Sequence, residues 1–222
     1  MLSLVIAESA LEIVPRELQK HNSVRASARR FNKRSSEILL DVSWHFAAMK
    51  NIKDEIKRGR PDLIHFCLLE SCSIPIYFEN KLQVFVHTID NKVIFFDKSV
   101  RLPKSYHRFA GLIEKLYSEG SIEEKGTKLL EIKKMSFEDL IKKINPRQII
   151  GLSSEGDSSS YQKVAEEIDE NTCIIVGGFA KGEFSDNIKK HFDKTRSVDK
   201  NPLEAHIIIS RVLYECEKRI IM

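Results

Sequence analysis

The last third of the chain alternates short apolar runs with amphipathic stretches, and this rhythm constrains the fold more than any other feature. The runs "RQIIGLS" (147–153) and "TCIIVGG" (172–178) predict buried strands, while "SSSYQKVAEEI" (158–168) and "SDNIKKHF" (185–192) predict the helices that follow them. Parallel strands need such crossover helices, whereas antiparallel strands do not. The sequence therefore predicts an α/β fold, with a mainly parallel sheet flanked by helices.

The remaining segments are predicted to complete a single domain, which suits a chain of 222 residues. We expect strands at 2–7 and 37–43, a hairpin turning at Asp90–Asn91, and a short edge strand within 194–199. Helical structure is expected within 11–20 and 45–58, from Pro61, from Ser105 to Gly120, at 137–144, and in a closing helix capped by Asn201 with Pro202 in its first turn. The segment 21–34 shows no clear apolar period, so we expect a loop or arm there.

Basic residues gather in two segments, although the net charge of +4 is modest. A solvated face explains one such cluster as well as any ligand does. Two clusters with few acidic residues between them favour a polyanionic partner such as nucleic acid. The first cluster contains Arg16, Lys20, His21, Arg25, Arg29, Arg30, Lys33 and Arg34, and the second contains Arg101, Lys104, His107 and Arg108.

The four cysteines, Cys67, Cys72, Cys173 and Cys216, are scattered and form no CxxC pair. This usage indicates reduced core residues in a cytosolic protein, so we expect a cytoplasmic location. His65 does not stand at zinc-ligand spacing from the cysteines near it, and we expect no metal. No apolar run approaches the length that spans a bilayer, so a membrane partner is not expected.

The run "IIVGGFAKGEF" (174–184) ends a predicted strand in Gly177 and Gly178, and Gly182 follows. Glycine lets a ligand approach the backbone closely, although a tight strand-to-helix turn explains the pair equally well. The spacing is not G-x-G-x-x-G, and only roughly forty residues follow, too few for the further βαβ units of a dinucleotide site. The turn and the segments "GLSSEG" and "SVDKNPL" suit a flat, neutral ligand such as an adenosine.

Three separated blocks carry a resemblance that spans nearly the whole chain. "VGGFAKGEF" together with "SVDKNPLEAHIIISRVLYECE" resembles the C-terminal signature of the SPOUT methyltransferases. "GRPDLIHFCLLES" and "SVRLPKSYHRFAGLIEKLYSEG" are similar to blocks of one branch of that class. This branch is the small-subunit rRNA pseudouridine N1-methyltransferases of archaea and eukaryotes, which act in ribosome biogenesis.

The resemblance implies a fold and a cofactor. SPOUT proteins thread the C-terminal chain into a trefoil knot, whose loops hold S-adenosylmethionine in a bent form, and a second subunit completes the site. A homodimer is therefore expected, with the apolar closing helix as a contact, although packing on the sheet also explains that helix. By resemblance, the cofactor-binding residues are Leu152, Gly177, Gly182, Val198, Asp199, Lys200, Asn201, Pro202 and Leu203.

The resemblance also implies that small-subunit rRNA is the partner. Arg60 and Asp62 are the candidate catalytic pair, in which Asp62 holds the Arg60 guanidinium in place; a plain helix cap is the other interpretation of Asp62. Arg60 is also a candidate RNA contact, with Arg101, Lys104 and Arg108 on the phosphates. The chain departs from the family pattern at Gly178, Lys104 and the segment "ESCSIPIYFEN".

We expect residues 1–222 to form one SPOUT methyltransferase domain, with a basic RNA-binding arm (about 21–34) and a hairpin and helix insertion (about 76–104). The expected reaction is methylation of N1 of a pseudouridine, and other ribosome-assembly proteins are further potential partners. Two alternatives stay open. One is a non-catalytic assembly factor that binds pre-rRNA, and the other is a SPOUT enzyme acting on tRNA or on a ribose 2′-OH.

Overall fold

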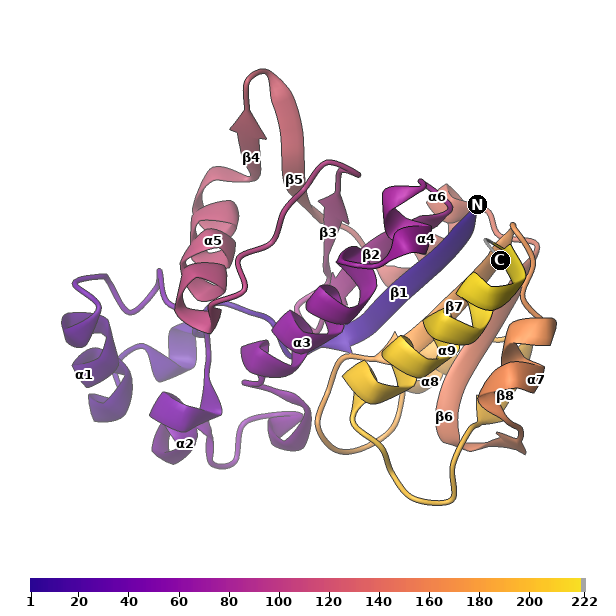
Figure 1. Cartoon of the computed structure of the whole chain (residues 1–222). Helices are drawn as coiled ribbons and strands as arrows, with labels where there is room; N and C mark the ends of the chain where they lie inside the picture. The colour runs from indigo at the N-terminus through magenta and orange to yellow at the C-terminus, as the bar shows by residue number, and fades with distance from the viewer. Residues whose placement is uncertain (221–222) are drawn as a thin grey trace.

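An eight-stranded sheet runs through the protein in the order β4-β5-β3-β2-β1-β7-β6-β8 (Figure 1). The computed structural model describes residues 1–220. The neighbouring pairs β2–β1, β1–β7, β7–β6 and β6–β8 are parallel. The three remaining pairs, β2–β3, β3–β5 and β5–β4, are antiparallel. The predicted mainly parallel sheet is thus confirmed. The strands are β1 (Leu2–Ser9), β2 (Leu82–Thr88), β3 (Lys92–Phe96), β4 (Ser121–Glu124), β5 (Thr127–Lys134), β6 (Gln148–Ser158), β7 (Thr172–Gly177) and β8 (Lys194–Ser197).

Helices cover both faces of the sheet, and side chains of β1 alternate between the two resulting cores. Leu4 and Ile6 enter the core that contains residues of α3 and α9, which lie side by side in Figure 1, whereas Val5 and Ala7 enter the core shared with α6 and α8. The helices are α1 (Asn22–Arg30), α2 (Val42–Met49), α3 (Pro61–Cys72), α4 (Pro75–Phe78), α5 (Tyr106–Glu119), α6 (Phe137–Ile144), α7 (Tyr161–Glu166), α8 (Asp186–Lys189) and α9 (Ala205–Ile220). Among the described residues, no helix is long and apolar enough to cross a membrane.

Local signals placed several elements correctly. Pro61 takes the first turn of α3, where its missing N–H costs nothing. Helix α5 ends at Gly120, whose φ of 80° is the left-handed conformation that glycine favours, and α6 ends at Asn145 in the same region. The hairpin around Asp90–Asn91 is confirmed by the antiparallel pairing of β2 with β3. This hairpin lies in the segment 76–104, which we expected to be an insertion, and its strand β2 also pairs in parallel with β1.

The N-terminal part differs from the prediction. The expected loop at 21–34 contains helix α1, because Val24 and Ala28 bury a narrow face in the cluster shared with α2. The expected strand at 37–43 makes one isolated bridge, and Ile38 and Leu40 enter that same cluster rather than the sheet. Within 11–20, the expected helix is reduced to the 3₁₀ turn Arg16–Leu18.

Two further differences concern later segments. The antiparallel strands β4 and β5 were not expected, because charged residues interrupt their apolar pattern. The closing helix begins at Ala205 rather than at Pro202, so Asn201 and Pro202 belong to the preceding loop instead of the cap and first turn. This loop passes beside the ends of three parallel strands.

Candidate functional site

A cavity of about 480 Å³ lies at the carboxyl ends of β7 and β8, beside the register shift in β6 that follows Leu152. In the sheet register, Leu152 of β6 stands opposite both Val176 and Arg196, so the parallel strands bring their carboxyl ends together. The lining comes from the three predicted segments: residues 152–154, residues 176–184 except 178, and residues 196–208 except 200, 206 and 207. Their convergence is confirmed, although "GLSSEG" lies within β6, at a register shift, and is not a free loop.

Two glycines make the turn after β7 possible. A Cβ on Gly178 would stand 2.4 Å from Ser9 Oγ and 2.7 Å from Ser9 Cα, a distance that the backbone cannot accommodate without moving. Gly182 has a φ of +94°, which a residue with a Cβ rarely adopts. The sequence therefore packs this turn against β1 and then bends it back along the cavity wall.

A carboxylate from β1 fixes the same loop. Glu8 Oε2 accepts hydrogen bonds from the ammonium of Lys57 at 2.9 Å and from the backbone N–H of Ser185 at 3.2 Å. The Lys57 ammonium also lies 4.6 Å from the ring centroid of Phe179, which lines the cavity. Sequence reasoning missed Glu8 and Lys57, because no local pattern links residues so far apart in the chain.

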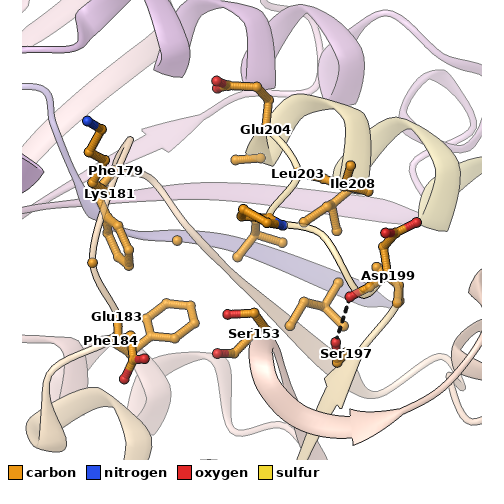
Figure 2. Close-up of a pocket in the computed structure, with 18 of the residues that line it drawn as sticks. Ser153, Phe179, Lys181, Glu183, Phe184, Ser197, Asp199, Leu203, Glu204 and Ile208 are labelled. Atoms are coloured by element: carbon orange, nitrogen blue, oxygen red, sulfur yellow. Dashed lines mark hydrogen bonds between the residues drawn. The ribbon is translucent and has the colours of Figure 1, made fainter.

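The opposite wall is held by ion pairs. Arg196 donates from Nε to Glu167 at 2.8 Å and from Nη2 at 3.0 Å, and this hydrogen bonding, with help from Lys194, lowers the Glu167 pKa to about 2. Ser197 Oγ donates to the backbone oxygen of Asp199 at 3.0 Å, as Figure 2 shows. Strand β8 is thus tied to Glu167 at the end of α7, and the start of the loop after β8 is held by the hydrogen bond between Ser197 and Asp199.

The structure brings most of the predicted cofactor residues to this cavity. Those that line it are Leu152, Gly177, Gly182, Val198, Asp199, Asn201, Pro202 and Leu203. Lys200 is exposed and does not line the cavity, although Asp199 and Asn201 on either side of it do. Figure 2 shows Ser153, Phe179 and Leu203 approaching the cavity from its three segments. Backbone groups and small side chains dominate, a lining that suits a ligand recognised by shape and by main-chain hydrogen bonds.

Arg60 and Asp62 form an ion pair beside this cavity, at the N-terminus of α3. The Arg60 guanidinium donates from Nε to Oδ1 at 2.8 Å and from Nη2 to Oδ2 at 3.0 Å, so Asp62 does hold Arg60 in place. The pKa of Arg60 is raised, first by the hydrogen bond to Asp62 and further by the charges of Glu204 and Asp41. Glu204 lines the cavity whereas Arg60 and Asp62 do not, so the ion pair lies outside the lining, within range of the Glu204 charge.

The second basic segment lies next to α3. His65 Nε2 and the backbone oxygen of Pro103 are 2.7 Å apart, which ties the segment before α5 to the helix that begins at Arg60. Arg101, Lys104 and Arg108 are all exposed, and the Arg101 guanidinium lies 4.8 Å from the ring centroid of Phe78. Their exposure leaves them accessible to a polyanion.

The cysteines are free and buried, as expected of core residues. Burial raises the pKa of Cys72 to about 12, so it carries no thiolate near neutral pH. Within residues 1–220, no three His, Cys, Asp or Glu side chains stand close enough to hold a metal ion.

The comparisons with known proteins agree with this arrangement. The family model "EMG1/NEP1 methyltransferase" matches residues 4–217. The ribosomal RNA small subunit methyltransferase Nep1 of Staphylothermus marinus is 39% identical over 218 residues, which cover 97% of this chain and 95% of that protein. Nep1 of Thermococcus kodakarensis is 38% identical over 220 residues, 98% of each chain. The crystal structure of Archaeoglobus fulgidus Nep1 bound to S-adenosylhomocysteine superposes with a TM-score of 0.87 at 32% identity, covering 97% of each chain.

Proposed function

Because the chain belongs to the EMG1/NEP1 methyltransferase family, we propose that it transfers a methyl group from S-adenosylmethionine to N1 of a pseudouridine in small-subunit rRNA. The observation that carries the proposal is the cavity formed by the carboxyl ends of β7 and β8 and by residues 152–154 of β6, together with the Arg60–Asp62 pair, whose guanidinium feels the charge of the lining residue Glu204. Relatives along the whole chain bear the name of small-subunit rRNA methyltransferases, which supports the substrate class.

The cavity fits the cofactor on structural grounds. Residues 176–184 and 196–203 offer backbone N–H and C=O groups and small side chains, which suit an adenosine and its neutral ribose. Leu152 and Ile208 add apolar surface for the flat face of the base. When bound there, S-adenosylmethionine supplies an electrophilic methyl carbon on a sulfonium.

Catalysis then depends mainly on alignment. The protein has to place N1 of the base in line with the carbon–sulfur bond, and no covalent intermediate with a side chain is needed. N1 gives up its proton to solvent, because no side chain is assigned as the base, and negative charge develops on the ring as that proton leaves. Forming the N1–methyl bond neutralises the ring, and the thioether would be the leaving group. Arg60 is a cation at neutral pH, and its hydrogen bond to Asp62 raises its pKa further; it stabilises the negative charge on the ring from beside the cavity. Asp62 serves as the positioning residue for Arg60 rather than as the base.

The RNA backbone would be held by the exposed residues Arg101, Lys104 and Arg108, together with Arg60. A homodimer, a trefoil knot around the cavity and a cytoplasmic location also belong to the proposal. Exposed rings on α3 and α9 favour the dimer: Phe66 is 48% exposed, Tyr214 is 55% exposed, and the Phe66 ring lies 5.4 Å from the His206 ring, centroid to centroid, in a tilted arrangement.

The proposal is tested by incubating the protein with labelled S-adenosylmethionine and two RNAs that differ only in carrying pseudouridine or uridine at one position. Label should enter only the pseudouridine RNA, and nucleoside digestion should place it on N1. Methylation of the uridine RNA alone, or of tRNA or a ribose oxygen, would contradict the substrate. Calorimetry with S-adenosylhomocysteine separates the assembly-factor alternative, which predicts no binding at micromolar concentrations.

A further inference from the structure

A second cavity, of about 260 Å³, lies between the α1–α2 unit and helix α5. Aromatic rings from both sides enter its lining, and none of its residues lines the first cavity. The lining residues are Phe31, Lys33, Ile38, Leu39, Asp41, Trp44, His45, Tyr106, His107, Ala110, Gly111 and Glu114. The proposed reaction uses none of these residues, so it does not explain why the cavity is there.

Hydrogen bonds hold the walls of this cavity in place. Glu114 accepts a bond from the backbone N–H of Leu39 at 2.9 Å and pairs with Lys33, which joins α5 to the segment after α1. Asp41 accepts a bond from the hydroxyl of Tyr106, which joins α5 to the start of α2. The cavity is therefore a fixed feature between two elements rather than a gap between loosely packed ones.

The charge of the lining selects the kind of ligand. Asp41 and Glu114 are carboxylates, and Lys33 is already paired with one of them, so a phosphate would be repelled. A flat, neutral ring that carries amino groups suits aromatic walls with carboxylate acceptors. A nucleobase has these properties, and adenine, cytosine and guanine carry such amino groups whereas uracil does not.

The rim of the cavity is basic. Helix α1 has no acidic residue in its first turn, and its exposed Arg25, Arg29 and Arg30 form no ion pair within the described part of the chain. The Arg30 guanidinium lies 4.8 Å from the ring centroid of Trp44, which lines the cavity, and exposed Arg108 belongs to α5, the helix that forms the other wall. An RNA strand could thus place a base inside while its phosphates contact arginines outside.

The second cavity is also coupled to the proposed active site. The backbone N–H of Val42, next to Asp41, donates to the oxygen of Gly59 at 2.9 Å, and Gly59 directly precedes Arg60. The segment that lines the second cavity is therefore hydrogen-bonded to the segment that carries Arg60, and the proposal requires an RNA loop that spans both. From this arrangement we propose that the cavity lined by Trp44 and Tyr106 binds one unstacked nucleobase of the RNA, distinct from the methylated one. This inference rests on the proposed function for the identity of the polymer.

Trp44 makes the proposal directly measurable, because it is the one tryptophan of the chain. A pseudouridine-containing RNA hairpin is titrated into the protein saturated with S-adenosylhomocysteine, and tryptophan fluorescence is recorded. We expect saturable quenching. In a series of hairpins with one abasic position each, the quenching should vanish at one loop position other than the pseudouridine.

Gly111 allows the cavity to be filled without removing a contact, since a Cβ there would meet no atom within 4 Å. Gly111→Leu should weaken RNA binding about ten-fold, because one stacked base is lost, and leave affinity for S-adenosylhomocysteine unchanged. Phe46→Ala is the matched control, since this ring lies on α2, is 61% exposed and does not line the cavity. Thermal melting should show that Gly111→Leu is folded, because α5 gains helix propensity.

The outcomes separate the two proposals. The proposal of a base-binding cavity would be overturned if the native protein methylates the hairpin without any change in Trp44 fluorescence. It would also be overturned if folded Gly111→Leu binds RNA with unchanged affinity. Neither result would contradict the proposed methyltransferase activity. Quenching that depends on one loop base, without methyl transfer to any RNA, would support the cavity and remove the proposed reaction.

Discussion

The carboxylate of Asp62 accepts two hydrogen bonds from one edge of the Arg60 guanidinium, from Nε to Oδ1 at 2.8 Å and from Nη2 to Oδ2 at 3.0 Å. The Arg60 side chain remains 30% exposed, so it is oriented without being buried. This geometry fixes the direction of a cation at the border between the first cavity and the exposed basic segment before α5.

Arg60→Ala should weaken RNA binding about ten-fold or more, the usual consequence of losing a charge-assisted hydrogen bond, and should leave S-adenosylhomocysteine affinity within about two-fold. Asp62→Asn should give a smaller loss, because the guanidinium stays but is less well oriented. Binding is measured by fluorescence anisotropy for RNA and by calorimetry for the cofactor product. An equal loss of both affinities in Arg60→Ala would indicate a folding defect and not an RNA contact.

Arg101→Ala, Lys104→Ala and Arg108→Ala should each weaken RNA binding with little dependence on sequence. Each should also lower the slope of log affinity against log salt by about 0.7 to 1, because one phosphate contact is removed. Lys142→Ala is the control: Lys142 is exposed on α6, whose core residues pack on the opposite face of the sheet from α3. A salt slope that stays at the native value in all three variants would exclude these phosphate contacts.

Gly182→Ala should weaken binding of S-adenosylhomocysteine, because a φ of +94° costs an alanine about 1–2 kcal/mol and the loop would shift along the cavity wall. Gly126→Ala is the matched control, because it introduces similar backbone strain away from the cavity. Gly126 lies in the β4–β5 turn, has a φ of +80° and has no atom within 4 Å of its Cβ position. Calorimetry should find native affinity in Gly126→Ala. Equal affinities in the two variants would show that the Gly182 turn does not shape the cavity.

The Glu167–Arg196 pair predicts a pH-dependent contribution to stability. The Glu167 pKa is lowered from 4.5 to about 2, so the stabilisation is complete above pH 4.5 and is lost as the pH falls toward 2. Glu167→Gln should lower the free energy of unfolding by about 1 kcal/mol at pH 7, a difference that shrinks as the pH falls below about 4.5. Urea denaturation measures this difference, with Glu166→Gln at the exposed neighbour as control. A pH-independent difference would contradict the account.

Much of the fold was predictable because its signals are local. Pro61, Gly120 and Asn145 mark helix ends through their own backbone preferences, and the late alternation of strands and helices leads directly to the cavity. The errors arose where tertiary packing decides. Ile38 and Leu40 have the pattern of a strand but pack in the hydrophobic cluster shared by α1 and α2. The apolar face of α1 is narrow and is interrupted by arginines in the sequence, so its helical period was not recognised.

The candidate site shows the same division. Most of the cofactor positions inferred by resemblance line the cavity, whereas Lys200 does not, and the resemblance alone could not distinguish it from its neighbours. Glu8 and Lys57 could not be found, since their link to the glycine turn depends on a contact between β1 and a distant 3₁₀ turn. The second cavity, with Trp44 and Gly111, depends likewise on α2 meeting α5.

A crystal structure of the protein with S-adenosylhomocysteine tests the central claim most directly. We expect a bent ligand in the cavity at the carboxyl ends of β7 and β8, with hydrogen bonds to the backbone of residues 177–182 and 198–203 and the sulfur turned toward the side on which Arg60 lies. A ligand bound elsewhere, or a cavity closed by its own loops beside an unthreaded C-terminal segment, would contradict it.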